Sequence, residues 1–262
     1  MSNSDQVGMV ISIVGAKGGS GKSTLAFQIA SEMMSAAHDI SVGLIDIDKK
    51  PSTYKLCQRL EEFSKWVETG SLPDDAMYMN DAIVGIIPKQ IKDKLRKRGR
   101  LPVPEYHVGN STAMRDVVEA MRRRNDITIV DTGGGDTKEN RAVISFSDLV
   151  IVPFLPSILD MDSMPETETM VGDIKAGQPK LKVKSVINEK PTSSNDFRSK
   201  QLSIVMNSYP VLKDHFRTKL ESRVAYKDSL LYGLGVCDWV DSKAKGQVSC
   251  LVKEIIEVIN DE

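Results

Sequence analysis

The chain has 262 residues, of which 40% are hydrophobic and 27% are charged, and its formal net charge is −1. These values are typical of an ordinary globular protein, and a net charge near zero excludes a general attraction to nucleic acid, so any such binding must come from a local patch. No apolar run approaches the roughly 18 residues of a membrane-spanning helix, and residues 1–8 lack the pattern of a secretory signal. We therefore expect a cytoplasmic protein.

Strand-like and helical segments alternate along the chain. This order predicts an α/β fold with a mostly parallel, twisted sheet and helices on both faces. The length fits one domain spanning residues 1–262. Cys57, Cys237 and Cys250 are odd in number and have no C-x-x-C spacing, which is typical of reduced, buried thiols.

The first informative stretch is a glycine-rich turn at residues 16–24, between an apolar run at 9–14 and a predicted helix over 25–37. A buried strand, a glycine-rich turn and a helix start are the context of a phosphate-binding loop. Glycines allow successive backbone N–H groups to point at one phosphate. Lys22 is placed to contact the β- and γ-phosphates of a nucleotide, and the Ser23 hydroxyl is placed to ligate Mg²⁺.

This loop has Ala16 where the general G-x-x-x-x-G-K-[ST] pattern has its first glycine, and it contains a second lysine, Lys17. The pattern K-G-G-x-G-K-[ST] resembles the deviant Walker A motif of the ParA/MinD family of P-loop ATPases. The resemblance implies that ATP and Mg²⁺ are cofactors and that Lys17 acts catalytically across a dimer interface, on the nucleotide of the partner subunit. The nucleotide-binding residues that it implies are Lys17, Gly18, Gly19, Ser20, Gly21, Lys22, Ser23 and Thr24.

The next strand is predicted over residues 41–48, and its period of two places Asp46 and Asp48 on one face at its carboxyl end. Ligands of open α/β sheets bind at this edge. The stretch resembles the D-x-D-P-Q segment of the family, in which the second aspartate positions or activates the attacking water. The resemblance assigns this catalytic role to Asp48 and a supporting role near Mg²⁺ to Asp46, although Lys49-Lys50-Pro51 replaces the family's Pro-Gln.

Residues 52–100 contain little recognisable chemistry. Helices are predicted over 53–67 and 88–98, with a loop at 70–75 between them. The second helix and its end are strongly basic, with Asp93 as the one acid. A run of this kind is either a solvated helix face, which is the more common case, or a patch that binds phosphates or a partner. The cations are Lys89, Lys92, Lys94, Arg96, Lys97, Arg98 and Arg100.

A short strand at 102–108 and a helix over 112–124, with Ser111 as its N-cap, lead to the apolar strand 127–131. A strand that ends in aspartate downstream of a phosphate-binding loop is a Walker B arrangement, so Asp131 is expected to hold Mg²⁺ through water. Glycines at 133–135 predict a mobile loop that responds to a γ-phosphate. The expected metal-binding residues are Ser23, Asp46 and Asp131.

The last part of the chain continues the alternation. Strands are predicted over 148–153 and 181–188, and helices over 164–176, 196–208 and 242–260. Asn188, at the end of the second of these strands, resembles the family asparagine that contacts adenine. The segment 223–229, followed by Gly235, resembles the R-x-A-[YF]…G segment near the family's base pocket.

Together these motifs imply, by resemblance, a ParA-type partition ATPase. ATP is expected to close two copies into a homodimer that binds DNA without sequence preference. A centromere-binding, ParB-like adaptor is expected to trigger hydrolysis and release, which positions a plasmid or similar cargo on the nucleoid. Residues 1–8 precede the first strand, which leaves no room for an N-terminal helix-turn-helix.

Three other functions are possible on this type of fold. A MinD-like ATPase that cycles on a membrane needs a basic amphipathic terminus, and an iron–sulfur reductase needs cysteines around 131–160, where there are none. A small-molecule ligase has no evident use for Lys17. We expect no membrane binding, because the end of the last helix has more acids than basic residues. These residues are Glu254, Glu257, Asp261 and Glu262 against Lys253.

The DNA-binding surface is not located by any motif. Binding through phosphates depends on clustered lysine and arginine and is steeply sensitive to salt. The candidates are the run at 89–100, the triplet Arg122-Arg123-Arg124, and the later residues Arg198, Lys200, Lys213, Arg217 and Lys219.

Overall fold

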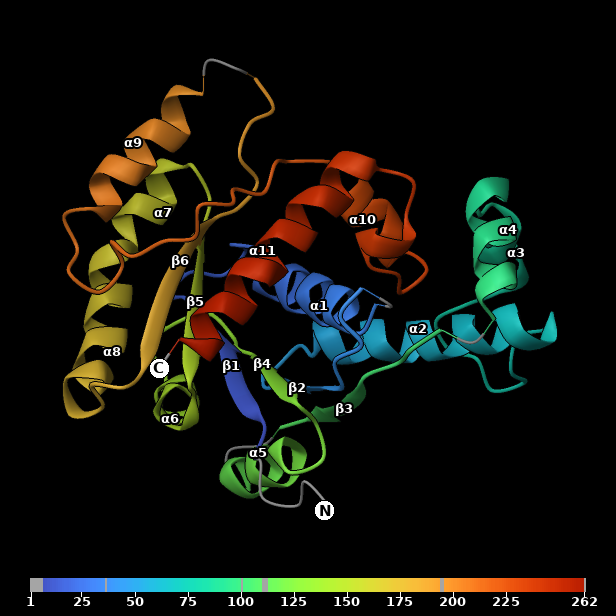
Figure 1. The fold of residues 1–262 in the computed structure, drawn as a ribbon, viewed down its shortest axis with the longest axis horizontal. Coiled ribbons are helices and arrows are strands. Elements are labelled where there is room, and N and C mark those ends of the chain that lie inside the picture. Colours follow the sequence, from blue (N-terminus) through green and yellow to red (C-terminus); the bar gives the residue numbers. More distant parts are fainter. Residues whose placement is uncertain (1–6, 36, 100, 110–112, 194–195, 262) are drawn as a thin grey trace.

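Six parallel strands form one sheet in the order β3-β2-β4-β1-β5-β6 (Figure 1). The computed structural model describes residues 7–35, 37–99, 101–109, 113–193 and 196–261. The predicted α/β fold is therefore confirmed. The strands are β1 (Met9–Ile13), β2 (Val42–Asp46), β3 (Glu105–Val108), β4 (Ile127–Asp131), β5 (Leu149–Phe154) and β6 (Lys182–Ile187).

Helices cover both faces of the sheet. One face packs against α1, α2 and α11, and the other against α5, α6 and α8 (Figure 1). The helices are α1 (Lys22–Met33), α2 (Ser52–Thr69), α3 (Asp81–Gly85), α4 (Lys89–Arg98), α5 (Met114–Arg122), α6 (Lys138–Phe146), α7 (Ile158–Asp162), α8 (Met164–Gly177), α9 (Phe197–Met206), α10 (Ala225–Leu230) and α11 (Ser242–Asn260), with a 3₁₀ turn, η1, at Val236–Asp238.

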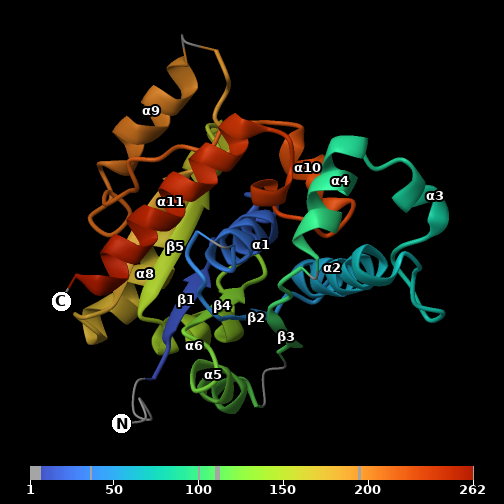
Figure 2. The ribbon, with the colours of Figure 1, turned by 45° about the vertical axis from the view of Figure 1, so that its right-hand side comes forward.

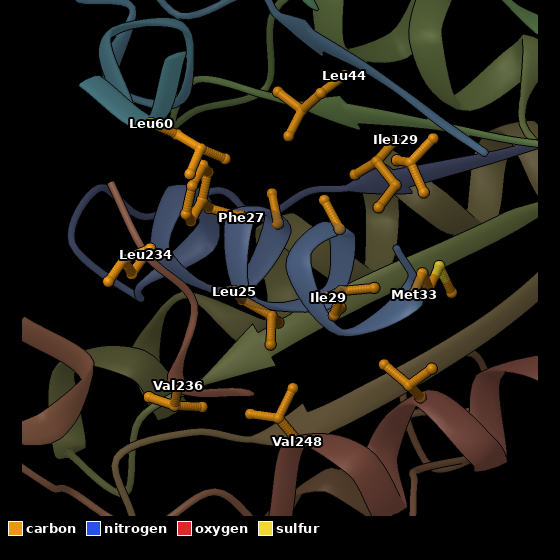
Figure 3. Close-up of a cluster of buried hydrophobic side chains, with 14 of the residues drawn as sticks. Leu25, Phe27, Ile29, Met33, Leu44, Leu60, Ile129, Leu234, Val236 and Val248 are labelled. Carbon is orange, nitrogen blue, oxygen red and sulfur yellow. The ribbon is translucent and has the colours of Figure 1, made fainter. Parts of the chain in front are cut away.

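Helix α1 lies inside the protein, not on its surface. Every residue from Leu25 to Met33 is buried, because the sheet covers one side of the helix and α2 and α11 cover the others. Figure 3 shows its side chains between Leu44 and Ile129 of the strands, Leu60 of α2 and Val248 of α11. Since α1 is held on all sides, the loop that precedes it has a rigid base.

Several predicted boundaries differ from the structure. The helix predicted over 25–37 ends at Met33, and the strand predicted over 102–108 covers Glu105–Val108. The strand predicted over 41–48 ends at Asp46, because the Asp48 N–H donates to the Asp46 side chain and turns the chain out of the sheet. The predicted N-cap, Ser111, lies outside the described residues. Helices α3, α6, α7 and α10 are additional.

The segment between α2 and β3 contains α3 and α4. In both views it stands apart from the sheet, beyond α2 (Figures 1 and 2). Within the described ranges, no helix has the length and hydropathy needed to cross a membrane.

Candidate nucleotide site

The glycine-rich loop joins β1 to α1 at the carboxyl edge of the sheet. Gly19 and Gly21 have φ angles of 86° and 83°, in the left-handed region that glycine favours. At Gly21 a Cβ atom would also lie 2.4 Å from the Asn188 amide nitrogen, so any other residue would be crowded there. No side chain caps the start of α1, which leaves its first N–H groups available to a phosphate.

Lys22, the first residue of α1, is 6% exposed. Its Nζ atom donates to the Lys17 carbonyl oxygen at 2.9 Å, so the side chain lies along the inside of the loop. Burial lowers the pKa of this ammonium group, whereas the carboxylates of Asp131, Asp48 and Asp160 oppose the change. The Lys22 side chain therefore lies where phosphates are predicted to bind, and the three carboxylates near it favour its charged form.

Asp131 ends β4 directly beside Asp46, the last residue of β2. It is fully buried, and burial raises the pKa of its carboxyl group to about 7, while the neighbouring Thr53 and Ser23 hydroxyls lower it. The Thr53 hydroxyl donates to Oδ2 of Asp131, but Oδ1 has no hydrogen-bond partner among the described residues. An unpartnered carboxylate oxygen next to the Ser23 hydroxyl is a donor set that suits Mg²⁺ or one of its waters.

Protein side chains alone do not complete a metal site here. In the part of the chain that the structure describes, no three His, Cys, Asp or Glu side chains are grouped so as to hold a metal ion. Mg²⁺ commonly binds through one or two protein groups together with substrate phosphates and water. Ser23 and Asp131 fit that arrangement, with the nucleotide supplying the other ligands.

Both carboxylate oxygens of Asp46 accept backbone N–H groups. Its Oδ1 accepts the Asp48 N–H, and its Oδ2 accepts the N–H groups of Thr53 and Tyr54 at the start of α2. Both oxygens therefore stabilise a loop and a helix N-terminus, which is favourable for a carboxylate. The supporting role of Asp46 near Mg²⁺ stays a prediction, beside this structural role.

Asp48 lies in the short loop between β2 and α2 and is half-buried. Its Oδ1 accepts the Lys50 N–H. A Cβ atom placed on Gly133 would lie 3.7 Å from Cγ of Asp48, so the carboxylate lies beside the loop that follows β4. This position beside the loop at 133–135 is compatible with the predicted role of Asp48, which is to orient the attacking water.

The loop after β4 contacts the P-loop backbone. A Cβ atom on Gly134 would lie 2.8 Å from the Gly18 nitrogen, so only glycine allows this close approach. The Asn140 side chain of α6 donates to the carbonyl oxygens of Gly133 and Gly135 and holds the loop in place. A change in the P-loop would therefore be transmitted directly to residues 133–135.

Lys17 does not extend freely from the surface. Its ammonium group forms an ion pair of 2.6 Å with Asp160 of α7, which is 1% exposed, while the Lys17 side chain is 29% exposed. Asp160 also accepts hydrogen bonds from the Ser157 hydroxyl and the Leu155 N–H. In the single chain, Lys17 therefore binds an acid of its own chain, and its role in a facing subunit stays a prediction.

A cavity of about 150 Å³ adjoins the start of α1. Asn188 contributes to its wall, and its amide also donates to the Ser20 carbonyl oxygen of the P-loop at 3.0 Å. Its predicted contact with adenine stays a prediction. The Arg223 segment lines the same cavity, and its place near a base pocket stays a prediction. The lining residues are Thr24, Leu25, Gln28, Asn188, Glu189, Leu220, Ser222, Arg223, Val224, Tyr226 and Lys227.

Comparison with known proteins agrees with this geometry. Residues 9–230 match the family described as ATPase MipZ, which is more than half of the chain. The chain belongs to the MipZ family of ATPases. Members of this family hydrolyse ATP, so the predictions of an ATPase and of ATP as cofactor are confirmed, and the resemblance to ParA/MinD proteins is confirmed with them.

Individual relatives of this MipZ-family chain are distant. Maintenance of carboxysome distribution protein A from Halothiobacillus neapolitanus is 23% identical over 227 residues, which are 86% of this chain and 85% of that protein. The cell division ATPase MinD of Pyrococcus furiosus is 16% identical, with a TM-score of 0.64 and coverage of 96% and 99%. A putative plasmid partition protein of Borrelia burgdorferi B31, bound to AMPPNP, is 13% identical, with a TM-score of 0.62 and coverage of 96% and 99%.

Three site residues of the MipZ-family chain were missed by sequence reasoning: Thr53, Asp160 and Asn140. Thr53 and Asp160 lie in the first turns of α2 and α7 and resemble ordinary helix-start residues. Asn140 lies on a helix that was not predicted. No local pattern marks Thr53 or Asp160, because Asp131 and Lys17 are distant in the sequence. Asn140 bonds to the nearby Gly133 and Gly135.

The hydrogen bond from Thr53 to Asp131 can be tested by substitution. Thr53→Val keeps the shape of this fully buried side chain but leaves Oδ2 of Asp131 without its donor. An unsatisfied buried acceptor costs about 1–3 kcal/mol, so we expect the free energy of unfolding in urea to fall by that amount. Thr53→Ser keeps the hydroxyl and should lose less. Equal stability of the valine variant and the parent would contradict this role.

Proposed function

We propose that this chain is a positioning ATPase of the partition type. ATP closes two copies into a homodimer, the dimer binds DNA without sequence preference, and a ParB-like adaptor triggers hydrolysis and release. The observation that supports this most is Lys17, a second lysine in the loop that lies on Asp160, outside the phosphate cradle that Lys22 already occupies.

Different residues of the chain perform different parts of the reaction at this site. Lys22 and the N–H groups of the loop bind the phosphates, and Ser23 and Asp131 hold Mg²⁺. When bound, Mg²⁺ neutralises phosphate charge as it develops. Asp48 orients the attacking water, and the loop at 133–135 registers the γ-phosphate through its contact with the P-loop.

The names of the relatives support a positioning role. They refer to carboxysome distribution, cell division and plasmid partition. Within this role, we propose that the cargo is a plasmid or is plasmid-like. The same function places the protein in the cytoplasm, with the ATP-bound dimer on the nucleoid.

A MinD-like membrane cycle is the second candidate, favoured by the structural likeness to MinD. It needs an amphipathic helix with a free apolar face. In α11 the apolar residues Val248, Leu251 and Ile255 are buried against the sheet and α1, so this helix has no such face to offer a lipid. We therefore prefer the partition function over the membrane cycle.

DNA binding is the test of this proposal. With ATP, the protein should retard two unrelated duplexes equally in a gel, and with ADP or no nucleotide it should retard neither. Because phosphate contacts release counterions, affinity should fall by about 10³–10⁵-fold between 50 and 200 mM salt if 6–10 phosphates are contacted. Flotation with anionic vesicles is the parallel measurement. ATP-dependent flotation without DNA binding would support the membrane cycle instead.

A further inference from the structure

Some basic residues of the candidate DNA surfaces form ion pairs with acids of the chain, and others do not. Arg122 bonds to Asp148 and to the Gly8 carbonyl oxygen, and Arg124 pairs with Glu105. Arg217 pairs with Glu254 and Glu257. The 122–124 triplet therefore loses two of its three cations to local acids. The later group loses only Arg217, since no ion pair of Arg198, Lys200, Lys213 or Lys219 is found among the described residues.

Helix α4 keeps most of its charge. Two carboxylates lie near its six cations, Asp93 on the helix itself and Asp238 at the end of η1. Within the described ranges, four of the six have no carboxylate within ion-pair distance, and the acids Asp74, Asp75 and Asp81 of the preceding segment make no ion pair with them. The four are Lys89, Lys92, Arg96 and Lys97.

The two flanks of α4 are attached to the body of the protein. On one flank, Lys92 and Arg96 lie over the Trp66 ring, 5.2 and 5.4 Å from its centroid. On the other, Arg98 pairs with Asp238 at 2.6 Å, and Lys94 donates to the Cys237 carbonyl oxygen. These contacts hold the helix without neutralising Lys92 or Arg96.

The outward face of α4 is polar and charged. Ile91 and Leu95, one turn apart, are fully buried and define the inner face. Lys89 and Lys97 lie on the opposite face and are exposed. Since α3 and α4 stand apart from the sheet (Figures 1 and 2), this face is accessible.

We infer that α4 is the surface through which this chain binds the phosphate backbone of DNA. The inference rests on the proposed function and locates its DNA contact. Lys89, Lys92, Arg96 and Lys97 bind phosphates, and Trp66 keeps Lys92 and Arg96 extended. A closed dimer presents two such helices, which doubles the number of phosphate contacts.

Charge complementarity favours nucleic acid over an anionic membrane as the occupant. A helix that lies on lipid buries an apolar face, but both apolar residues of α4 are already buried in the protein core. Ile86, in the turn before α4, is 70% exposed, and one side chain is too small an apolar surface to anchor a helix.

The test removes two charges in each of two places. Lys89→Gln/Lys97→Gln changes exposed α4 residues that make no ion pair within the described part of the chain. The matched control is Lys200→Gln/Lys213→Gln, on and after α9. It makes the same change of charge at exposed residues that form no ion pair with any described residue. Binding to a duplex of random sequence is measured with ATP as a function of salt, beside flotation with vesicles containing anionic lipid.

We expect the α4 variant to bind roughly tenfold more weakly per lost contact near 0.1 M salt, with a salt slope smaller by about 0.9 for each contact. The control should keep the parental slope. Asp93→Asn, which removes the acid from the outward face, should strengthen binding. ATP turnover without DNA should be parental in all three variants.

The outcomes separate this inference from the proposed function. If the parent protein binds DNA with ATP and the α4 variant has the same affinity and slope, the inference is overturned and the function stands. If the parent binds no DNA at any salt, the proposed function fails first. Loss of vesicle flotation instead of DNA binding in the α4 variant would assign the surface to lipid and overturn the inference.

Discussion

Replacing Lys17 by alanine should leave ATP binding intact and lower the rate of hydrolysis by about 10³–10⁵-fold, as loss of an arginine finger does in related phosphoryl transfers. The physical reason is that a cation brought to the γ-phosphate from outside offsets charge that develops only in the transition state. In the single chain this cation binds Asp160 instead. When Lys17 leaves, Asp160 keeps its bonds from Ser157 and Leu155, so the carboxylate is not left unsatisfied.

Mixing Lys17→Ala with Asp48→Ala tests whether the lysine acts in trans. Each variant should be inactive alone. In a heterodimer, the site on the Lys17→Ala subunit keeps its own Asp48 and receives Lys17 from the other subunit, so one site in two is intact. Single-turnover hydrolysis should return as one variant is titrated into the other. Heterodimers that form and stay inactive would show that Lys17 does not act across the interface.

Replacing Lys22 by alanine should abolish ATP binding. The residue is buried at the start of α1, with its ammonium group inside the loop. Losing a charge-assisted contact of about 3 kcal/mol corresponds to at least about a 100-fold loss of affinity.

Calorimetry with ATP and Mg²⁺ measures this loss directly. Lys17→Ala is the matched control, because it removes the other lysine of the same loop and should bind ATP normally. Undiminished affinity in Lys22→Ala would mean that the loop at 16–24 does not hold the nucleotide, and it would remove the basis for every other assignment in the site.

Sequence patterns were sufficient to predict those parts of the site that are built from consecutive residues. The order strand, glycine-rich turn, helix predicts the P-loop because its geometry is built from consecutive residues. Asp131 was predictable for a related reason: the carboxyl ends of parallel strands meet at one edge, so an aspartate that ends a buried strand must lie near the loop after β1.

The sequence alone therefore determined the fold class, the position of the glycine-rich loop before α1, the position of Asp131 at the same edge of the sheet, and the family. Only the tertiary structure decided that Lys17 binds Asp160, that Thr53 bonds to Asp131, and that Asp46 caps α2. It also decided that four of the six cations of α4 make no ion pair among the described residues, whereas Arg122 and Arg124 do. The reason is that a charged side chain takes its partner from whatever element packs beside it: Lys17 and Asp160 are 143 residues apart, and Thr53 and Asp131 are 78 apart. No periodicity or motif encodes contacts over such separations.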